Sequence, residues 1–224
     1  NYVTVGVDAS CDYATFQLAF AGGERLIRLT SSVTETVAGA PPSGNYHIIV
    51  EDPDFVLTFA TGIIWVQAAA IEMDFYLNGA TITYTSGATD EQLFDLTGGS
   101  NRISFYGGGT FTNSSSTHTN NDLCYFNIEQ HLYGHYVFNL PNVEGGGITC
   151  SGSGNFTLDS AEFIGGGSGC YAGISLGNSV LGKIGALEFS GTWSTTNNQN
   201  PFSIVNSAGN RHLTTIQSIY MTTT

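Results

Sequence analysis

Basic side chains are scarce in this sequence. Five lysine and arginine residues stand against 18 acidic residues, which gives a formal net charge of −13 and a pI near 4.4. A protein that binds nucleic acid neutralises the phosphates with clustered cations. So few cations on so acidic a chain argue against a nucleic-acid partner.

Long apolar runs are missing as well. A membrane-spanning helix needs about 18 or more consecutive apolar residues, and the longest candidate, residues 62–66 followed by Gln67 and three alanines, is far shorter. We therefore expect no membrane insertion. Yet 41% of the 224 residues are hydrophobic, so the chain can bury a continuous core.

Metal-binding motifs are absent. The four cysteines show no Cys-x-x-Cys spacing of the kind found in zinc sites and thioredoxin-type redox motifs. Glu129 and His131, with His135 nearby, have metal-binding side chains, but their spacing matches no zinc motif. We expect neither a metal nor another cofactor.

Helical periodicity is almost absent, because glycine, asparagine and threonine break the chain too often for long helices. One exception lies near the N-terminus. Asp12 is a suitable N-cap for a helix over about residues 13–20, with Phe16 and Phe20 on one face and Gly22 at its end. The rest of the chain is typical of short strands.

Those strands repeat one pattern, in which an apolar residue expected to face inward is followed five or six positions later by another. The pairs are Val50 and Phe55, Leu77 and Ile82, Phe105 and Phe111, Phe138 and Val143, Leu158 and Phe163, Ile184 and Phe189, and Ile216 and Met221. Counted from Leu29, successive first members are 21, 27, 28, 33, 20, 26 and 32 residues apart. Such a period, carried by short strands with variable insertions, indicates a solenoid whose coils stack on one another.

The pattern predicts an all-β fold, a parallel β-helix of about eight rungs. Glycine runs at 107–109, 145–147 and 165–167 fall at or just after the expected corners, where tight turns favour glycine. Residues 1–24 would form an N-terminal cap whose short helix covers the first rung, and residues 25–224 the β-helix domain. No comparable lid is expected at the other end, which favours oligomerisation.

The cap carries the run Asp12-Tyr13-Ala14-Thr15-Phe16-Gln17. It resembles the capping helix that precedes the first rung in pectate-lyase-like right-handed β-helices. That family is large among bacteriophage tailspikes, receptor-binding spikes and other virion surface proteins, and among polysaccharide lyases and hydrolases. The resemblance covers the cap and the rhythm of the rungs, and it implies a fold rather than a chemistry.

Enzymes of that family carry residues from which this sequence departs. A pectate-lyase-type site would need a basic residue beside calcium-binding acids, and only Arg102 falls near acidic positions in the rung alignment. Polygalacturonase-like motifs are reduced to Gly134-His135-Tyr136. Asp52, Asp54 and Asp74 are weak candidates for catalytic carboxylates, and a solvated turn at the Asp-Pro step is the favoured interpretation of the first two.

Register arithmetic predicts a polar ladder on the outside of the coil. Side chains alternate between the two faces of a strand, so a residue that lies three positions before an inward residue points outward. The members of this ladder are His47, Asp74, Arg102, His135 and Asn155. The ladder would be a glycan-binding or catalytic strip, a subunit interface, or an ordinary surface salt bridge worth at most about 1 kcal/mol. Interface or salt bridge is favoured over catalysis, because no second carboxylate lies in the same strip.

Cysteines and aromatic residues suggest two more features. Cys124, Cys150 and Cys170 lie 26 and 20 residues apart, about one repeat, so a disulfide between neighbouring rungs is feasible. Cys150 with Cys170 is the first choice, and stacked free thiols are the alternative. Exposed aromatic residues could stack on sugar rings, although such residues in β proteins are more often core or interface. These aromatic residues are Tyr76, Tyr106, Trp65 and Trp193.

These features together predict a non-catalytic virion surface protein of a bacteriophage, either a receptor-binding spike or fibre or a capsid decoration protein. It would form a homotrimer on the extracellular surface of the virion, where it would contact other virion proteins and host-surface polysaccharide. One alternative is a polysaccharide-degrading tailspike glycosidase or lyase. Another is a secreted carbohydrate-binding adhesin.

Overall fold

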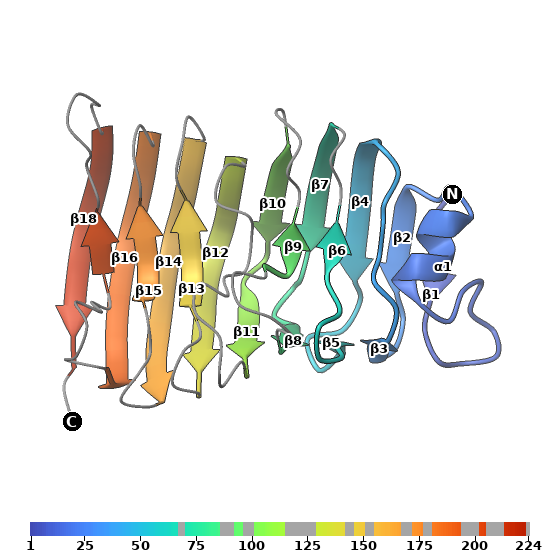
Figure 1. The fold of residues 1–224 in the computed structure, drawn as a ribbon, viewed down its shortest axis with the longest axis horizontal. Helices are drawn as coiled ribbons and strands as arrows, with labels where there is room; N and C mark the ends of the chain where they lie inside the picture. The colour runs from blue at the N-terminus through green and yellow to red at the C-terminus, as the bar shows by residue number, and fades with distance from the viewer. Residues whose placement is uncertain are drawn as a thin grey trace.

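The computed structural model describes residues 1–66, 70–85, 92–95, 101–114, 129–141, 146–150, 155–166, 172–176, 181–193, 202–204 and 213–222. These residues form a mostly β structure, a parallel β-solenoid of about five turns with little helix (Figure 1). No helix in this part of the chain is long and apolar enough to cross a membrane.

One continuous row of parallel strands runs the whole length of the solenoid. In spatial order these are β1 (Val3–Val5), β2 (Leu26–Leu29), β4 (Gly44–Val50), β7 (Ile71–Tyr76), β10 (Arg102–Tyr106), β12 (Glu129–Leu140), β14 (Asn155–Gly166), β16 (Leu181–Thr192) and β18 (Leu213–Met221). We call this the long row. Its first strand lies within the residues assigned to the N-terminal cap, so the cap also contributes to the sheet.

Other strands form the remaining sides of the coil. A second row contains β3 (Val33–Glu35), β5 (Val56–Phe59), β8 (Thr81–Tyr84) and β11 (Gly109–Asn113), and it joins β12. β6 (Trp65–Val66) pairs with β9 (Phe94–Asp95), and β13 (Gly146–Cys150), β15 (Ala172–Leu176) and β17 (Phe202–Ile204) form a separate small sheet. All of these pairings are parallel.

Inward-facing residues of the long row stack in one column, which confirms the vertical repeat. Its members, in register from strand to strand, are Ile27, Ile48, Phe75, Phe105, Leu132, Leu158, Ile184 and Ile216. The register corrects the prediction on three strands: Ile27, Ile48 and Phe75 occupy the places in the column that were predicted for Leu29, Val50 and Leu77. Leu77 is buried too, two residues further along the chain. Residues two positions apart on a strand point to the same face, so both side chains point inward. Their spacing in the sequence does not decide which of them joins the column.

A second inner column lies beyond the corner and consists largely of phenylalanine. Its members are Val33, Leu57, Ile82, Phe111, Phe138, Phe163, Phe189 and Met221. The rings of Phe138 lie 5.1 Å from Phe111 and 4.8 Å from Phe163, nearly parallel in both cases. The sequence predicts Phe138 in the first column, but Leu132 occupies that place. Phenylalanine occurs in both columns, so the residue type does not show to which column Phe138 belongs. Its proposed partner Val143 lies outside the described residues.

Glycines at one corner are needed for close approach between turns. Gly107, Gly108 and Gly109 all have positive φ, as expected for the first of the predicted glycine runs. A Cβ on Gly108 would lie 2.6 Å from the carbonyl oxygen of His135 on the next turn. On the previous turn Asn78 also has positive φ, and its side-chain amide donates to the carbonyl oxygen of Val50. The corners therefore stack as tightly as the strands.

Helix α1 (Phe16–Ala21) closes the N-terminal end of the coil (Figure 1). Its N-cap is Thr15, whose hydroxyl accepts from the amide of Leu18. Asp12, the expected cap, instead accepts hydrogen bonds from Thr4 in β1. The rings of Phe16 and Phe20 are buried against Trp65, at 5.4 and 5.0 Å between centroids. Four residues apart, they lie on one helix face and fill the open end of the core.

Glu35 in β3 supports the start of α1 from within the core. Its carboxylate is fully buried and accepts hydrogen bonds from the amides of Phe16, at 2.7 Å, and Gln17, at 3.4 Å. These amides are among those that a helix leaves without an internal partner. At the other end of the described stack, the strand β18 leaves Tyr220 and Met221 largely exposed.

Replacing Glu35 by glutamine tests this arrangement through pH. Burial raises the pKa of Glu35 above its ordinary value of 4.5, although the two amide hydrogen bonds oppose the effect. The folded chain therefore holds the proton at pH values where the unfolded chain has released it. The contribution to stability is full below the ordinary pKa and is lost as the pH rises through the folded pKa.

We expect the Glu35→Gln variant to lack this loss, so its free energy of unfolding should rise relative to that of the unmodified protein as the pH increases above 4.5. Urea unfolding at several pH values measures the difference. Asp54→Asn, at an exposed position, is the control. Identical pH slopes for Glu35→Gln and the unmodified protein would contradict the assignment.

The phenylalanine column is tested by Phe138→Ala. Removing a fully buried ring between two stacked neighbours should lower the free energy of unfolding by about 3–5 kcal/mol. Phe138→Leu should lose less, because leucine fills part of the space. Tyr220→Ala, at an exposed position, should change stability by no more than about 0.5 kcal/mol. A loss for Phe138→Ala as small as that of the control would show that the column is not tightly packed.

Candidate functional site

The outer face of the long row carries a line of polar residues in register, which we call the polar row. Its members are His47, Asp74, Ser104, His131, Thr157, Lys183 and Thr215. They alternate with the inward column along each strand, so they lie on the opposite face. The sequence-predicted ladder and the polar row share only His47 and Asp74, which lie directly opposite one another.

The other predicted ladder residues belong to different lines. Arg102 lies opposite Glu72 and not Asp74, since the register between β7 and β10 differs by two residues from the prediction. Asn155 lies opposite Leu181 and donates its side-chain amide to Glu129. His135 lies beyond the corner, opposite Ser160, and its Nδ1 is 3.0 Å from that hydroxyl. The ladder is therefore three short lines, and its proposed role stays a prediction.

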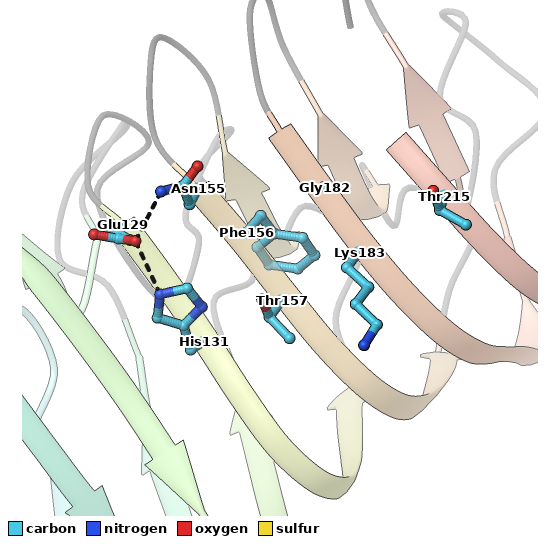
Figure 2. A pocket seen from close by; sticks show the side chains of 8 residues that line it. All are labelled: Glu129, His131, Asn155, Phe156, Thr157, Gly182, Lys183 and Thr215. Atoms are coloured by element: carbon cyan, nitrogen blue, oxygen red, sulfur yellow. Dashed lines mark hydrogen bonds and ion pairs between the residues drawn. The ribbon is translucent and has the colours of Figure 1, made fainter. Parts of the chain in front are cut away.

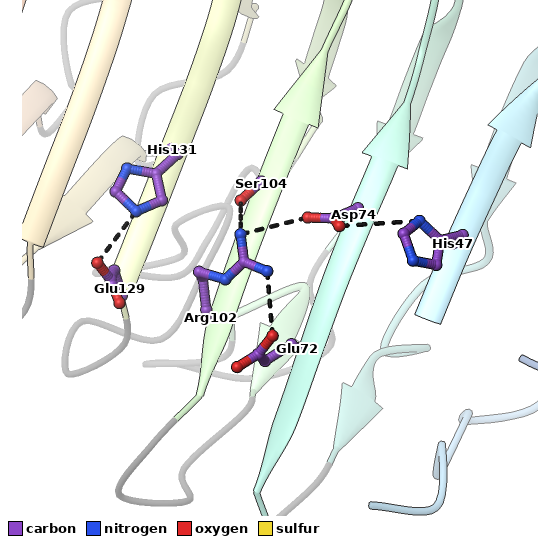
Figure 3. Close-up of polar contacts among 7 residues, drawn as sticks. All are labelled: His47, Glu72, Asp74, Arg102, Ser104, Glu129 and His131. Atoms are coloured by element: carbon purple, nitrogen blue, oxygen red, sulfur yellow. Dashed lines mark hydrogen bonds and ion pairs between the residues drawn. The ribbon is translucent and has the colours of Figure 1, made fainter. Parts of the chain in front are cut away.

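Arg102 nevertheless contacts two members of the polar row, Asp74 and Ser104 (Figure 3). Its Nη2 lies 3.1 Å from Glu72 Oε2, and its Nη1 lies 3.4 Å from Asp74 Oδ1. Nη1 also donates to Ser104 Oγ at 3.1 Å. One guanidinium thus holds two carboxylates and a hydroxyl on two neighbouring strands, and the planar fork of arginine is suited to that task.

Electrostatics favour a permanently charged Arg102. Burial acts to lower its pKa, but the hydrogen bond to Glu72 and the charges of Asp74 and Glu72 outweigh burial and raise the pKa. The Asp74 side chain is only 17% exposed, and His47 Nδ1 lies 3.8 Å from its other oxygen. A second, separate contact joins His131 Nε2 to Glu129 Oε1 at 3.1 Å on β12.

Beside the polar row three tyrosines form a stack, which we call the tyrosine ladder. Tyr76, Tyr106 and Tyr133 lie in register on β7, β10 and β12. Their ring centroids are 4.7 and 5.1 Å apart, and the rings are nearly parallel. Burial is the largest cause that raises the pKa of Tyr76 and Tyr133, so both phenols stay protonated near neutral pH. Because the faces cover one another, the ladder offers ring edges and hydroxyls rather than open faces.

The polar row continues into an open depression of about 410 Å³ over β12, β14, β16 and β18 (Figure 2). Its lining residues are Glu129, His131, Asn155, Phe156, Thr157, Gly182, Lys183 and Thr215. The ring of His131 also stacks against Tyr133, with centroids 5.8 Å apart. The tyrosine ladder and the depression are therefore parts of one continuous surface.

The weak catalytic candidates do not assemble into a site. Asp52 Oδ1 accepts from the amide of Asp54, and the carbonyl of Asp52 accepts from the amide of Phe55. This is the solvated turn that the Asp-Pro step favoured. Asp74, the third candidate, lies on the long row and is held by Arg102.

Of the aromatic residues considered for sugar stacking, two belong to the core. Trp65 is fully buried and contacts α1, and Trp193 packs against Phe189. Tyr76 and Tyr106 lie on the outer face in the tyrosine ladder, where their ring faces stack on one another, and a role in sugar binding stays a prediction. The predicted disulfide is untested, because Cys170 lies outside the described residues. Cys150 is in β13, opposite Leu176 of β15.

Several members of the site escaped the sequence arithmetic: Glu72, Ser104, His131, Tyr133 and Lys183. Their signal is the register set by the inward residues of the long row. Ser104, His131 and Lys183 each lie one residue before such a residue, Tyr133 lies one residue after Leu132, and Glu72 lies three residues before Phe75. The prediction counted three residues back, which reaches the polar row from Leu77 but falls two residues short of it from Phe105 and Leu158, and which leads from Phe138 to His135 beyond the corner.

Compared with models of protein families, with curated proteins and with solved structures, the chain matches none. The parallel β-solenoid and the geometry of its outer face are therefore the observations on which a function rests.

Arg102→Ala tests whether the charge cluster is structural. The change removes the partner of a mostly buried carboxylate, so we expect a loss of about 1–2 kcal/mol, between the values for exposed and fully buried ion pairs. Adding Asp74→Asn to it should recover part of the loss, and a double-mutant cycle by urea unfolding measures the coupling.

Arg28→Ala is the matched control, because the Arg28–Glu51 pair is 43% and 41% exposed at its side chains and should contribute less than about 0.5 kcal/mol. Equal losses in the Arg102 and Arg28 variants would contradict a special role for the Arg102 cluster.

Proposed function

We propose that the protein is a non-catalytic binding solenoid on the surface of a bacteriophage virion, and that the outer face of its long row recognises host-surface polysaccharide. The observation that carries this proposal is the tyrosine ladder beside the polar row. Phenols recur there once per strand, next to charged side chains fixed by contacts across neighbouring strands.

A polysaccharide is a repeating ligand, and this surface repeats along the solenoid axis. The hydrogen-bond donors and acceptors of the polar row lie beside the ring edges of the tyrosine ladder. Sugars require this mixture, since their rings have polar hydroxyls and apolar C–H groups. Stacking and ion pairing hold these side chains in place before any ligand binds. Little conformational entropy is then lost on binding, which favours affinity.

Two observations support a binding rather than a catalytic role. Glu72 and Asp74 share one guanidinium, so neither carboxylate of this cluster is a free general acid or base. Asp52 and Asp54 lie in a turn with a structural hydrogen bond. A non-catalytic receptor-binding or decoration protein fits these contacts better than a tailspike glycosidase or lyase does.

The assignment to a virion is supported by the capping sequence, which resembles that of pectate-lyase-like spikes, and by the elongated stack. We propose that the coil is right-handed, and that the nine strands of the long row belong to about eight rungs. The exposed apolar side chains of β18, among them Ile219 and Met221, support contacts with other chains, in a homotrimer or with other virion proteins.

Tyr106→Leu tests the binding role. The change removes the central ring of the tyrosine ladder, and we expect affinity for the recognised polysaccharide to fall at least about tenfold. Tyr106→Phe keeps the stack and loses one hydroxyl, so it should have a smaller effect of a few fold. Binding is measured on an array of bacterial capsular and lipopolysaccharide O-antigen polysaccharides, and thermal unfolding confirms that each variant is folded.

Tyr220→Phe on β18 is the matched control and should bind like the unmodified protein. Unchanged binding by Tyr106→Leu, or no binding to any polysaccharide on the array, would overturn the glycan role. Release of reducing ends from a bound polysaccharide would overturn the non-catalytic assignment. Recovery of the chain only from culture supernatant, and never from purified particles, would replace the virion protein by a secreted adhesin.

A further inference from the structure

Of the four lysine and arginine residues that the structure describes, three are engaged by protein groups. Among the described residues, Arg25 donates to the carbonyl oxygens of Pro42 and Ser43, Arg28 pairs with Glu51, and Arg102 pairs with Glu72 and Asp74. Lys183 differs from these three arginines. It is the only lysine in the sequence, it is exposed, and it makes no ion pair within the described part of the chain.

Lys183 lies where the outer face is hollowed. It lines the depression over β12 to β18 and also a smaller neighbouring depression of about 270 Å³, which contains Asp159 and Gln217. Thr157 and Thr215 lie directly opposite it on the two adjacent strands. An ammonium group therefore has a hydroxyl-bearing residue on either side along the polar row (Figure 2).

On the side of the larger depression opposite Lys183, the lining contains a carboxylate. Glu129 Oε1 accepts from Asn155 Nδ2 at 3.0 Å and lies 3.1 Å from His131 Nε2, so a carboxylate, an amide and an imidazole form one hydrogen-bonded group. The depression is thus basic on β16 and acidic with amide character at the start of β12 and β14. Of the other nearby charges, Asp159 accepts the amide of Gly134 at 2.9 Å.

We propose that this depression is a subsite for an acidic sugar, a uronic acid residue of the polysaccharide, which deepens and rests on the glycan-binding function proposed above. The sugar carboxylate binds at Lys183 and accepts hydrogen bonds from the hydroxyls of Thr157 and Thr215. The ring hydroxyls face Glu129 and Asn155, which accept and donate hydrogen bonds. A charge-assisted hydrogen bond of this kind is stronger than a neutral one.

Position along the coil links the subsite to the tyrosine ladder. His131 lines the depression and stacks on Tyr133, the last ring of the ladder. A chain that lies along the ladder therefore reaches Lys183 by continuing over β14. The net charge of −13 opposes acidic ligands in general, so selection for a carboxylated sugar requires a local cation at the point of contact.

The test uses two probes that differ only in charge: a glucuronate-containing tetrasaccharide and its carboxyl-reduced form, in which each glucuronate becomes glucose. We expect the unmodified protein to bind the acidic form about tenfold more tightly. Lys183→Gln should lose that preference and bind both forms like the neutral one. Arg28→Gln, at the far end of the long row, removes one charge elsewhere and should keep the preference.

A second measurement reports on Lys183 directly. Reductive methylation with ¹³C keeps the charge and labels only the N-terminal amine and this single lysine. The Lys183 methyl signal should shift on addition of the acidic tetrasaccharide and stay in place with the reduced form.

Equal affinity for the two probes in the unmodified protein would overturn the subsite while leaving the glycan role intact. An equal loss of preference in Arg28→Gln would also overturn it, because the effect would then be one of net charge. Tyr106→Leu should weaken the binding of both probes. If neither probe binds and the polysaccharide array is also blank, the glycan function itself fails and the subsite fails with it.

Discussion

Parallel stacking in register is the constraint on which this molecule depends. Each strand of the long row hydrogen bonds to the strands of the turns before and after it, so a side chain has as its nearest neighbours the residues at the same level of those turns. The side chain at each position must therefore pack against the side chains at the same level of the adjacent turns. Inside the coil this produces columns of leucine, isoleucine and phenylalanine, and outside it produces lines of ion pairs and stacked phenols.

The same constraint accounts for the ends and the corners. A column of side chains is unfinished at its first turn, and Phe16 and Phe20 of α1 supply the missing layer there. A corner must allow the backbone of one turn to touch that of the next, which is why glycines with positive φ are required at 107–109. Rigid positioning of the outer side chains is a result of this close packing, and the proposed recognition of a repeating ligand depends on it.

Sequence patterns predicted the solenoid and much of its core. Phe105, Leu158, Ile184 and Ile216 were assigned to one column, and Phe111, Phe163 and Phe189 to another, because apolar residues five or six positions apart recur with the period of a coil. The register failed at Leu29, Val50 and Leu77, which lie two residues beyond the column, and at Phe138. All four are inward residues, and only hydrogen bonding between strands determines which neighbour each one faces. An error of two residues preserves the inner face but exchanges partners on the outer face, so the core prediction survived and the ladder of charges did not.

Ring stacking also makes the register between turns detectable by spectroscopy. The electronic transitions of closely spaced, nearly parallel aromatic rings couple to one another, and the coupling depends steeply on their separation and relative orientation. The tyrosine ladder holds such rings on β7, β10 and β12, and the phenylalanine column holds them on β11, β12, β14 and β16, so both sets span the step from the turn of β10 and β11 to the turn of β12. A slip between two turns would disturb both sets together, so near-ultraviolet circular dichroism carries information on the alignment of the coil that backbone signals do not contain.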